Sequence, residues 1–374
     1  MCVERTEPAP PPPSPPSPST PPPSPRPPPA PQPPPSQFIT IATTGDAASG
    51  DKKYDGAVAI GDIVYFVPCD QNNVGVFNAT SNIFSTIALT GDAASGGRKY
   101  SGGAAVGNKV VFAPDTQWNV GVIDTTDNTF TTFPAKKVSY NDYFASYGFQ
   151  GAVAVGSKVY FAPSLLVNDY VGVFDTVTNV FSTVADRSGD GYAGAVAVGS
   201  MVYFVPNDYA DVCVLNTTSN NVLPIIDTGD INSSSMYSGA VAVGTKVYMV
   251  PFGVDTVGVV DTATNSFSTI GTTGLTGINY KGAAAVGTKV YFGPYSRNDV
   301  GVLDTTTDVF STIALTGQTA GGAVHVAPIK TQGLERKPGA SSYTRKHLSL
   351  PYPDPCSYRL WCQQSAPDEA HFNV

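Results

Sequence analysis

Aspartate is the only residue type that this chain offers in quantity for acid–base chemistry. Between residues 37 and 328 the sequence has 23 Asp, no Glu and a single histidine, His325. General acid–base and nucleophilic catalysis most often recruit His, Glu or an activated Cys, so a Ser-His-Asp group or a histidine metal site cannot be assembled from this stretch. Two Asp carboxyls at a suitable separation can still hydrolyse a glycosidic bond. An Asp-based hydrolase therefore stays open as the enzymatic alternative.

A second recurring pattern also involves Asp but predicts turns rather than a metal site. Asp stands beside Thr at one position of a repeated phrase, which Asn occupies twice, at Asp124, Asp175, Asp261, Asp304, Asn78 and Asn216. These side chains cap tight turns by bonding nearby backbone N–H groups. The five cysteines, Cys2, Cys69, Cys213, Cys356 and Cys362, show no zinc-ligand spacing and no disulfide framework. We predict no catalytic residue, no metal and no cofactor.

The charge of the same stretch restricts its partners. Its 23 Asp stand against 10 Lys and 3 Arg, a net charge of −10. Phosphate contacts need a clustered basic surface, so nucleic acid is not an expected partner. No apolar run approaches the roughly 18 to 20 residues that a membrane helix needs, so membrane insertion is not expected either. The remaining partners are a protein or a carbohydrate, and we expect a monomer.

The elements that position these residues belong to a repeat. A small apolar phrase flanked by glycines begins at Gly56, Gly102, Gly151, Gly194, Gly239 and Gly282, with spacings of 46, 49, 43, 45 and 43 residues. That range is the period of four-stranded propeller blades. The sequence therefore predicts an all-β fold, a β-propeller.

One unit shows how a blade is divided. In the third unit, residues 151–155 are small and apolar, as an innermost strand near the axis requires, and residues 158–163 are rich in β-branched and aromatic residues. Residues 171–175 form the third strand, and residues 180–184 alternate like a half-exposed outer strand. A single unit cannot bury both of its faces, so the units must stack around a closed ring.

These residues resemble a known class of repeat. Val-Tyr-Phe-Ala-Pro, followed by Val-Gly-Val-Phe-Asp-Thr-Val-Thr-Asn-Val-Phe-Ser-Thr, resembles the YVTN type of propeller repeat found in surface-layer proteins. The units are more loosely similar to Kelch and NHL repeats, although they lack the double-glycine and tryptophan pattern of Kelch. The resemblance spans the array and implies architecture only, because propellers host many unrelated functions.

The ends of the array bear on the number of blades. Residues 38–50 nearly copy residues 84–96, so the array opens on an outer strand, and residues 322–328 supply a new inner strand that contains His325. A closing blade shared between these two segments would make seven blades. Its middle strands are not recognisable, so six is the alternative.

The chain is expected to have three regions: 1–36, 37–328 and 329–374. Residues 1–36 hold 19 of the 33 prolines, between Pro8 and Pro35, and should stay in solvated polyproline II. Their Ser-Pro-Pro units resemble hydroxyproline-rich modules of green-algal and plant cell-wall glycoproteins. Residues 37–328 form the propeller. Residues 329–374 drop the repeat and are expected to be irregular or disordered.

Two sets of aromatic residues are candidate ligand contacts. In a propeller, the loop after the second strand and the loop after the outer strand open on one face, which we call the variable-loop face because these loops differ between units. Binding residues gather in diverse loops on a fixed scaffold, which nominates the loop residues Trp118, Tyr143, Tyr209 and Tyr295. The second set precedes each inner strand: Tyr54, Tyr100, Phe149, Tyr192, Tyr237 and Tyr280. These six either form a ring of contacts or wedge adjacent blades with their rings buried.

The sequence supports two non-enzymatic hypotheses beside the hydrolase. The first is a secreted or wall-associated propeller that binds a carbohydrate or a protein through the variable-loop face. Asn78, Asn216 and Asn232 head N-glycosylation motifs and fit this hypothesis. The second is an intracellular scaffold that uses the Pro-rich segment for recruitment. The first seven residues do not form a signal peptide, so the localisation is not assigned.

Overall fold

The fold was obtained as a computed structural model, and its regular part is almost purely β. The structure describes residues 52–135, 148–164, 170–185, 191–208, 211–229 and 235–315. Within these ranges the chain forms antiparallel sheets and one 3-10 turn, η2 (Gly91–Ala94). No helix in the described ranges is long and apolar enough to cross a membrane.

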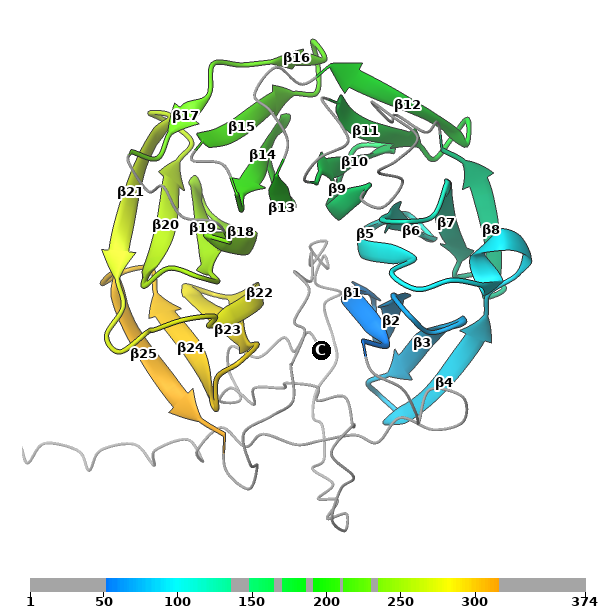
Figure 1. Cartoon of the computed structure of the whole chain (residues 1–374), viewed down its shortest axis with the longest axis horizontal. Coiled ribbons are helices and arrows are strands. Elements are labelled where there is room, and N and C mark those ends of the chain that lie inside the picture. Colours follow the sequence, from blue (N-terminus) through cyan, green and yellow to red (C-terminus); the bar gives the residue numbers. More distant parts are fainter. Residues whose placement is uncertain are drawn as a thin grey trace, which may run out of the picture. The chain divides into compact units, whose positions relative to one another are not determined.

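The described strands form six blades, each a meander in which consecutive strands pair, except that β17 of blade 4 pairs with β15 (Figure 1). Blades 1 to 3 contain β1 (Tyr54–Ile60), β2 (Ile63–Pro68), β3 (Asn73–Asn78) and β4 (Ile83–Ala88); β5 (Tyr100–Val106), β6 (Lys109–Pro114), β7 (Asn119–Asp124) and β8 (Thr129–Pro134); and β9 (Phe149–Val155), β10 (Lys158–Pro163), β11 (Tyr170–Asp175) and β12 (Val180–Ala185).

Blades 4 to 6 continue the same order around the ring. They contain β13 (Tyr192–Val198), β14 (Met201–Pro206), β15 (Asp211–Asn216), β16 (Asn221–Val222) and β17 (Ile226–Asp227); β18 (Tyr237–Val243), β19 (Lys246–Pro251), β20 (Thr256–Asp261) and β21 (Ser266–Gly271); and β22 (Tyr280–Val286), β23 (Lys289–Pro294), β24 (Asp299–Asp304) and β25 (Val309–Ala314). The outer strand of blade 4 is split into β16 and β17 around Pro224, which has no N–H to donate to the ladder.

Two repeated turns fix the hairpins on the face opposite the variable loops, which we call the constant face. The turn between the first and second strands places a glycine at φ near +60°, as at Gly61 and Gly156. The turn between the third and fourth strands places Asn or Asp in the same left-handed region, as at Asn128 (φ 57°) and Asp308 (φ 54°). Gly and Asn adopt this conformation at low cost, which explains why these residues recur in the turns.

The hydrophobic core lies between blades. Five clusters of buried residues each combine the apolar face of one blade with the opposite face of the next, from blades 1–2 through blades 5–6. Hydrogen bonds add to these contacts: Lys109 Nζ in blade 2 donates to the carbonyl of Thr176 in blade 3 (2.7 Å). Two smaller clusters each belong to a single blade. One lies in blade 1 around Val64 and Phe77, and the other in blade 6 around Val300 and Val302.

The structure confirms the predicted all-β propeller and matches the six-blade alternative. The two segments expected to form a shared seventh blade, residues 38–50 and 322–328, lie outside the described residues. So do the Pro-rich segment before residue 37 and the segment 329–374. Within the third unit, the four predicted strands coincide with β9 to β12 to within two residues.

Candidate functional site

Each inner strand begins with the same irregularity. The register between first and second strand shifts just after the aromatic residue, for example between Tyr54 and Ala57 and between Tyr192 and Ala195. Such bulges redirect a side chain. Here the glycine two positions after the aromatic residue has a positive φ, and a Cβ on Gly151 (φ +94°) would lie 2.6 Å from Cα of Gly194 in the next blade. Only glycine allows the inner strands to approach this closely.

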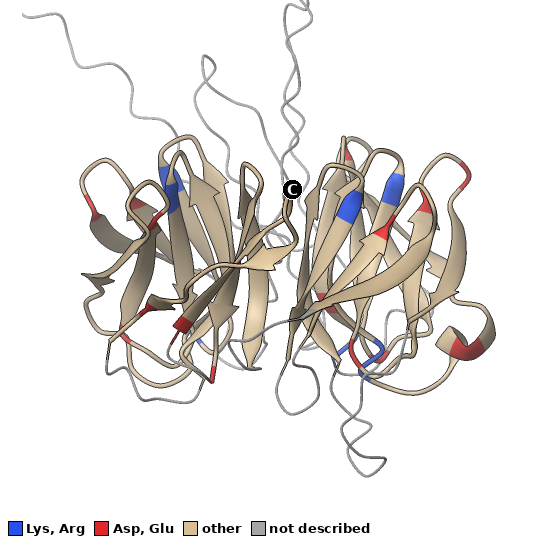
Figure 2. Cartoon of the chain, turned by 90° about the horizontal axis from the view of Figure 1, so that it is seen from above, with Lys and Arg blue, Asp and Glu red and all other residues tan. Residues whose placement is uncertain are grey.

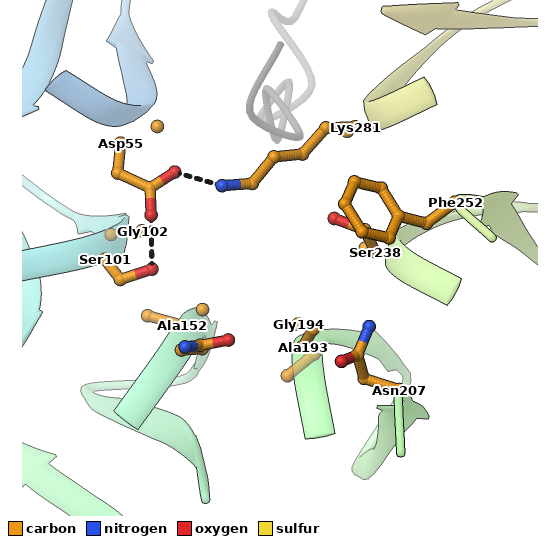
Figure 3. Close-up of a pocket in the computed structure, with 17 residues that line it drawn as sticks. Asp55, Ser101, Gly102, Ala152, Ala193, Gly194, Asn207, Ser238, Phe252 and Lys281 are labelled. Atoms are coloured by element: carbon orange, nitrogen blue, oxygen red, sulfur yellow. Dashed lines mark hydrogen bonds and ion pairs between the residues drawn. The ribbon is translucent and has the colours of Figure 1, made fainter. Parts of the chain in front are cut away.

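The bulge brings one variable side chain per blade to the axis. The residue between the aromatic residue and the glycine differs from blade to blade, and all six line a single cavity of about 190 Å³ (Figure 3). We call them the bulge set: Asp55, Ser101, Gln150, Ala193, Ser238 and Lys281. The cavity lies at the variable-loop end of the inner strands, because these residues begin their strands.

A second set of variable positions follows the proline that ends each second strand. In all six blades the N–H of this residue donates to the carbonyl of the residue before the aromatic one, with N···O distances of 2.9 to 3.2 Å. We call these residues the post-proline set: Cys69, Asp115, Ser164, Asn207, Phe252 and Tyr295. Asn207 and Phe252 line the cavity. A constant backbone frame thus presents a different side chain in each blade.

Three polar side chains of the cavity are joined to one another by hydrogen bonds. Lys281 Nζ donates to Asp55 Oδ1 (2.7 Å), and Ser101 Oγ donates to Asp55 Oδ2 (2.8 Å), as Figure 3 shows. Both members of the ion pair are partly exposed, at 31% for Lys281 and 22% for Asp55. This contact joins the last described blade to the first.

Asp115 belongs to the post-proline set but is not among the residues that line the cavity, and its pKa is shifted. Burial raises the pKa of Asp115 to about 6 and outweighs the opposing effect of Arg98, which forms an ion pair with it at 3.1 Å. The charge of Asp55 contributes further to this raised pKa. Burial likewise raises the pKa of the Cys69 thiol to about 12, so Cys69 is protonated at neutral pH and is not an activated nucleophile.

The six aromatic residues that precede the inner strands are buried in the blades. Their exposed fractions are 4% or less: Tyr54, Tyr100, Phe149, Tyr192, Tyr237 and Tyr280. In five blades the ring fills the space above a glycine in the third strand, and in blade 4 the corresponding residue is Cys213. The ring of Tyr100, for example, lies 2.9 Å from where a Cβ on Gly121 would be. Two hydroxyls donate to Asn within the blade, Tyr54 to Asn73 and Tyr100 to Asn119 (2.5 Å each). Buried rings are what the wedge interpretation expects, and a role of these six residues in ligand contact stays a prediction.

The aromatic residues predicted from the loops are dispersed. Trp118 is 55% exposed, but it is not among the residues that line the cavity. Tyr295 is half-buried and packs edge-on against Phe252, with ring centroids 5.4 Å apart. Tyr143 and Tyr209 lie outside the described residues. Phe252, which the sequence reasoning did not select, is the aromatic residue at the cavity.

The recurring Asp and Asn residues cap turns on the constant face, as predicted. Asp175 Oδ1 accepts the N–H groups of Val177 and Thr178 (2.9 and 3.1 Å), and Asn216 Oδ1 accepts those of Thr218 and Ser219 (2.9 and 3.3 Å). Among the described residues no group of three His, Cys, Asp or Glu side chains is arranged to hold a metal ion.

Comparison with known proteins defines the class of fold. No protein-family model matches the chain, and no curated protein does. Solved structures do match. Streptogramin B lyase superposes with a TM-score of 0.62 at 14% identity, covering 78% of this chain and 91% of the lyase. The structure titled U3-55K has a TM-score of 0.56 at 11% identity, with 74% and 84% covered. Hydrazine synthase of Kuenenia stuttgartiensis has a TM-score of 0.53 at 14% identity, with 69% and 78% covered. At these identities the likeness shows the propeller fold alone.

The bulge set could have been recognised in the sequence, because its residues vary while their neighbours hardly change. In units whose neighbouring positions hardly change, the residue between aromatic and glycine reads Asp, Ser, Gln, Ala, Ser and Lys. A position that varies inside a constant phrase is free of the packing role that its neighbours share. Asn207 and Phe252 follow the same rule after a constant proline.

Proposed function

We propose that this chain is a non-enzymatic binding propeller that holds one sugar unit of a carbohydrate in the axial cavity at its variable-loop face. The observation that carries the proposal is the contrast between a repeated frame and a non-repeated lining. The backbone around the cavity is the same in every blade, but the bulge set offers a carboxylate, an ammonium, an amide and two hydroxyls. Such a lining suits an asymmetric ligand bound in one orientation.

The chemistry of the lining favours a sugar over a purely apolar ligand. Sugar hydroxyls both donate and accept, and Asp55, Lys281 and Gln150 together offer acceptors and donors. Phe252 adds an apolar ring surface for the C–H groups of a pyranose. The cavity of about 190 Å³ is smaller than typical drug-sized pockets of roughly 300 Å³ or more. It therefore suits a single ring, and a protein partner would enter it only with one side chain.

The test is a glycan-array screen of the full chain, followed by titration of the best ligand. Gln150→Ala and Asp55→Asn should each weaken binding by about tenfold, the worth of one well-placed hydrogen bond to a polar or charged group. Asp261→Asn on the constant face keeps a turn-capping side chain and serves as the control, with unchanged affinity. The proposal fails if the cavity variants bind like the parent chain or if the control loses binding to the same extent.

Asp115 supports a second candidate function, an Asp-based hydrolase acting on the same carbohydrate. A carboxyl with a pKa of about 6 beside the charge of Asp55 is suited to donate a proton near neutral pH. Prolonged incubation of the array ligands with the chain, analysed for cleavage products, separates the two functions. Turnover that Asp115→Asn abolishes would establish the hydrolase, and intact ligand after incubation favours the binding function.

A further inference from the structure

The constant face carries a second pattern that differs between blades. There, the first residue of the second strand pairs directly with the last residue of the third. In blades 2, 3, 5 and 6 the pair is Lys with Asp: Lys109–Asp124, Lys158–Asp175, Lys246–Asp261 and Lys289–Asp304. Viewed from the side, Lys and Asp positions lie together along the edge of the ring opposite η2 (Figure 2).

In blade 2 the Asp of the pair accepts hydrogen bonds from the turn that follows it, whereas Lys109 donates to Thr176 and Asn179 of blade 3. Thr126 donates to Asp124 through its hydroxyl (2.6 Å) and its N–H (3.0 Å). These bonds, with a smaller contribution from Lys109, lower the pKa of Asp124. The pKa of Asp304 is lowered in the same way by Thr306, with a contribution from Lys289. Lys thus stands opposite Asp in four blades, and in blades 2 and 6 the charge of the Lys contributes to the lowered pKa of the Asp.

Blades 1 and 4 change both members of the pair together. Ile63 stands opposite Asn78, and Met201 stands opposite Asn216. The turn is kept, because Asn78 Oδ1 accepts the N–H groups of Thr80 and Ser81 (3.0 and 2.9 Å), just as an Asp would. Capping explains an Asn in place of Asp. Ile63 and Met201 each pack against an inter-blade core cluster and remain partly exposed, so part of each apolar side chain lies at the surface.

In both blades the residue two positions after the Asn is a threonine, so Asn78-Ala79-Thr80 and Asn216-Thr217-Thr218 are acceptor motifs for N-linked glycans. This threonine is shared with blades 2 and 6, where Thr126 and Thr306 occupy the same position. The capping bonds use the carbonyl oxygen of each Asn side chain. The amide nitrogen Nδ2, the atom that receives the glycan, has no hydrogen-bond partner among the described residues.

We propose that Asn78 and Asn216 are N-glycosylated and that Ile63 and Met201 are apolar seats for the first sugar ring. In the reaction, Nδ2 forms a bond to C1 of a sugar carried by a lipid pyrophosphate. The C1–O bond to the pyrophosphate breaks, the lipid pyrophosphate leaves, and the amide nitrogen loses a proton. A Lys–Asp pair in this place would lose hydration under the sugar, whereas Ile or Met can pack against its C–H groups.

The two sites occupy the first and fourth blades and share the face opposite the cavity. Glycans there would leave the variable-loop face open. The proposal is independent of the carbohydrate-binding function, because it concerns a different face and a different reaction. The third motif, at Asn232, lies outside the described residues and carries no part of the argument.

The experiment uses the full chain, directed through the secretory pathway of a eukaryotic host by an added signal peptide. Peptide mapping by mass spectrometry, with and without an N-glycan-releasing amidase, should show most molecules occupied at Asn78 and at Asn216. Asn78→Gln and Asn216→Gln should each remove one glycan from the intact mass. An unoccupied Asn78 or Asn216 in the secreted, folded chain overturns the proposal.

A matched control tests the role of the apolar partner. Asp124→Asn creates an acceptor motif before Thr126 in a blade that retains Lys109. Its occupancy should be lower than that of Asn216, and adding Lys109→Met should raise it towards the Asn216 value. Equal occupancy of the new acceptor with and without Lys109→Met overturns the assignment of Ile63 and Met201 as seats. A melting curve for each variant checks that it is folded.

Discussion

At the scale of single residues, the chain combines positions that repeat with positions that do not. Aromatic residues and glycines at the start of each inner strand recur because the packing requires them. In five of the six blades the ring fills the space above a glycine in the third strand, and the bulge glycine lets neighbouring inner strands meet. Between them stands a residue without such a requirement. Its side chain faces the axial cavity in each blade, and its identity sets the chemistry there.

The raised pKa of Asp115 predicts how the free energy of unfolding depends on pH. Its pKa is raised by burial from 3.8 to about 6, so the folded protein retains a proton that the unfolded chain releases. Its contribution to the free energy of unfolding therefore falls as pH rises from about 4 to about 6. Asp115→Asn does not titrate, so between pH 4 and pH 7 the variant should gain about 3 kcal/mol relative to the parent chain. Urea unfolding at several pH values measures this difference.

Asp304→Asn is the control for that experiment, because the shift at Asp304 has the opposite sign. Hydrogen bonds from Thr306 lower the pKa of Asp304, so its contribution is present above the pKa of the unfolded chain and is lost at more acidic pH. Relative to the parent chain, this variant should improve only as the pH falls below about 4. A pH-independent difference for Asp115→Asn would show that the carboxyl is not held protonated by the fold.

At the scale of elements, the hairpins and their bulges are what the repeat specifies. All four strands predicted for the third unit are present, because the small inner strand, the β-branched second strand and the alternating outer strand have distinct compositions. The break in the outer strand of blade 4 follows from Pro224, a residue visible in the sequence. The bulge was not predicted, since it arises from the close approach of two inner strands in different blades.

Substitutions at two glycines distinguish the free-energy cost of backbone conformation from the free-energy cost of crowded packing. Gly151 and Gly156 both have positive φ, but a Cβ on Gly151 would lie 2.6 Å from Cα of Gly194, whereas Gly156 has nothing within 4 Å. Gly156→Ala should lower the free energy of unfolding by about 1 to 2 kcal/mol, the cost of the left-handed conformation. Gly151→Ala should lose about 3 kcal/mol or more, because backbone atoms must move apart. Denaturant titration of both variants measures the difference, and equal losses would contradict the close contact at the hub.

At the scale of the whole molecule, the sequence predicts the array but not which residues meet at its axis. Asp55 and Lys281 are 226 residues apart and come together because the blades circle round. No local sequence pattern predicts such a pair. For the aromatic residues before the inner strands, burial was one of the two predicted alternatives. In five blades it is supported by a third-strand glycine that leaves room for the ring. The number of blades expected from the ends of the array, seven, rests on segments outside the described residues.

The arrangement of the core predicts a gradient of local stability. Opening blade 3 or blade 4 disrupts two shared clusters, whereas opening blade 1 or blade 6 disrupts one. In repeat proteins, stability is approximately a sum over units and their interfaces. Amide hydrogen exchange should therefore be slower at Val159 and Val202 than at the equivalent Val64 and Val290. Equal protection at all four would show that other parts of the chain close blades 1 and 6 equally well.

The ion pair between Lys281 and Asp55 has a consequence for how a bound ligand would act. A molecule that binds both side chains connects the first described blade to the last. By mass action, any ligand selective for the native chain stabilises it according to its concentration over its dissociation constant. The gain in stability would be largest at blades 1 and 6, which this ion pair joins. A ligand bound in the axial cavity would therefore slow the local opening of these two blades.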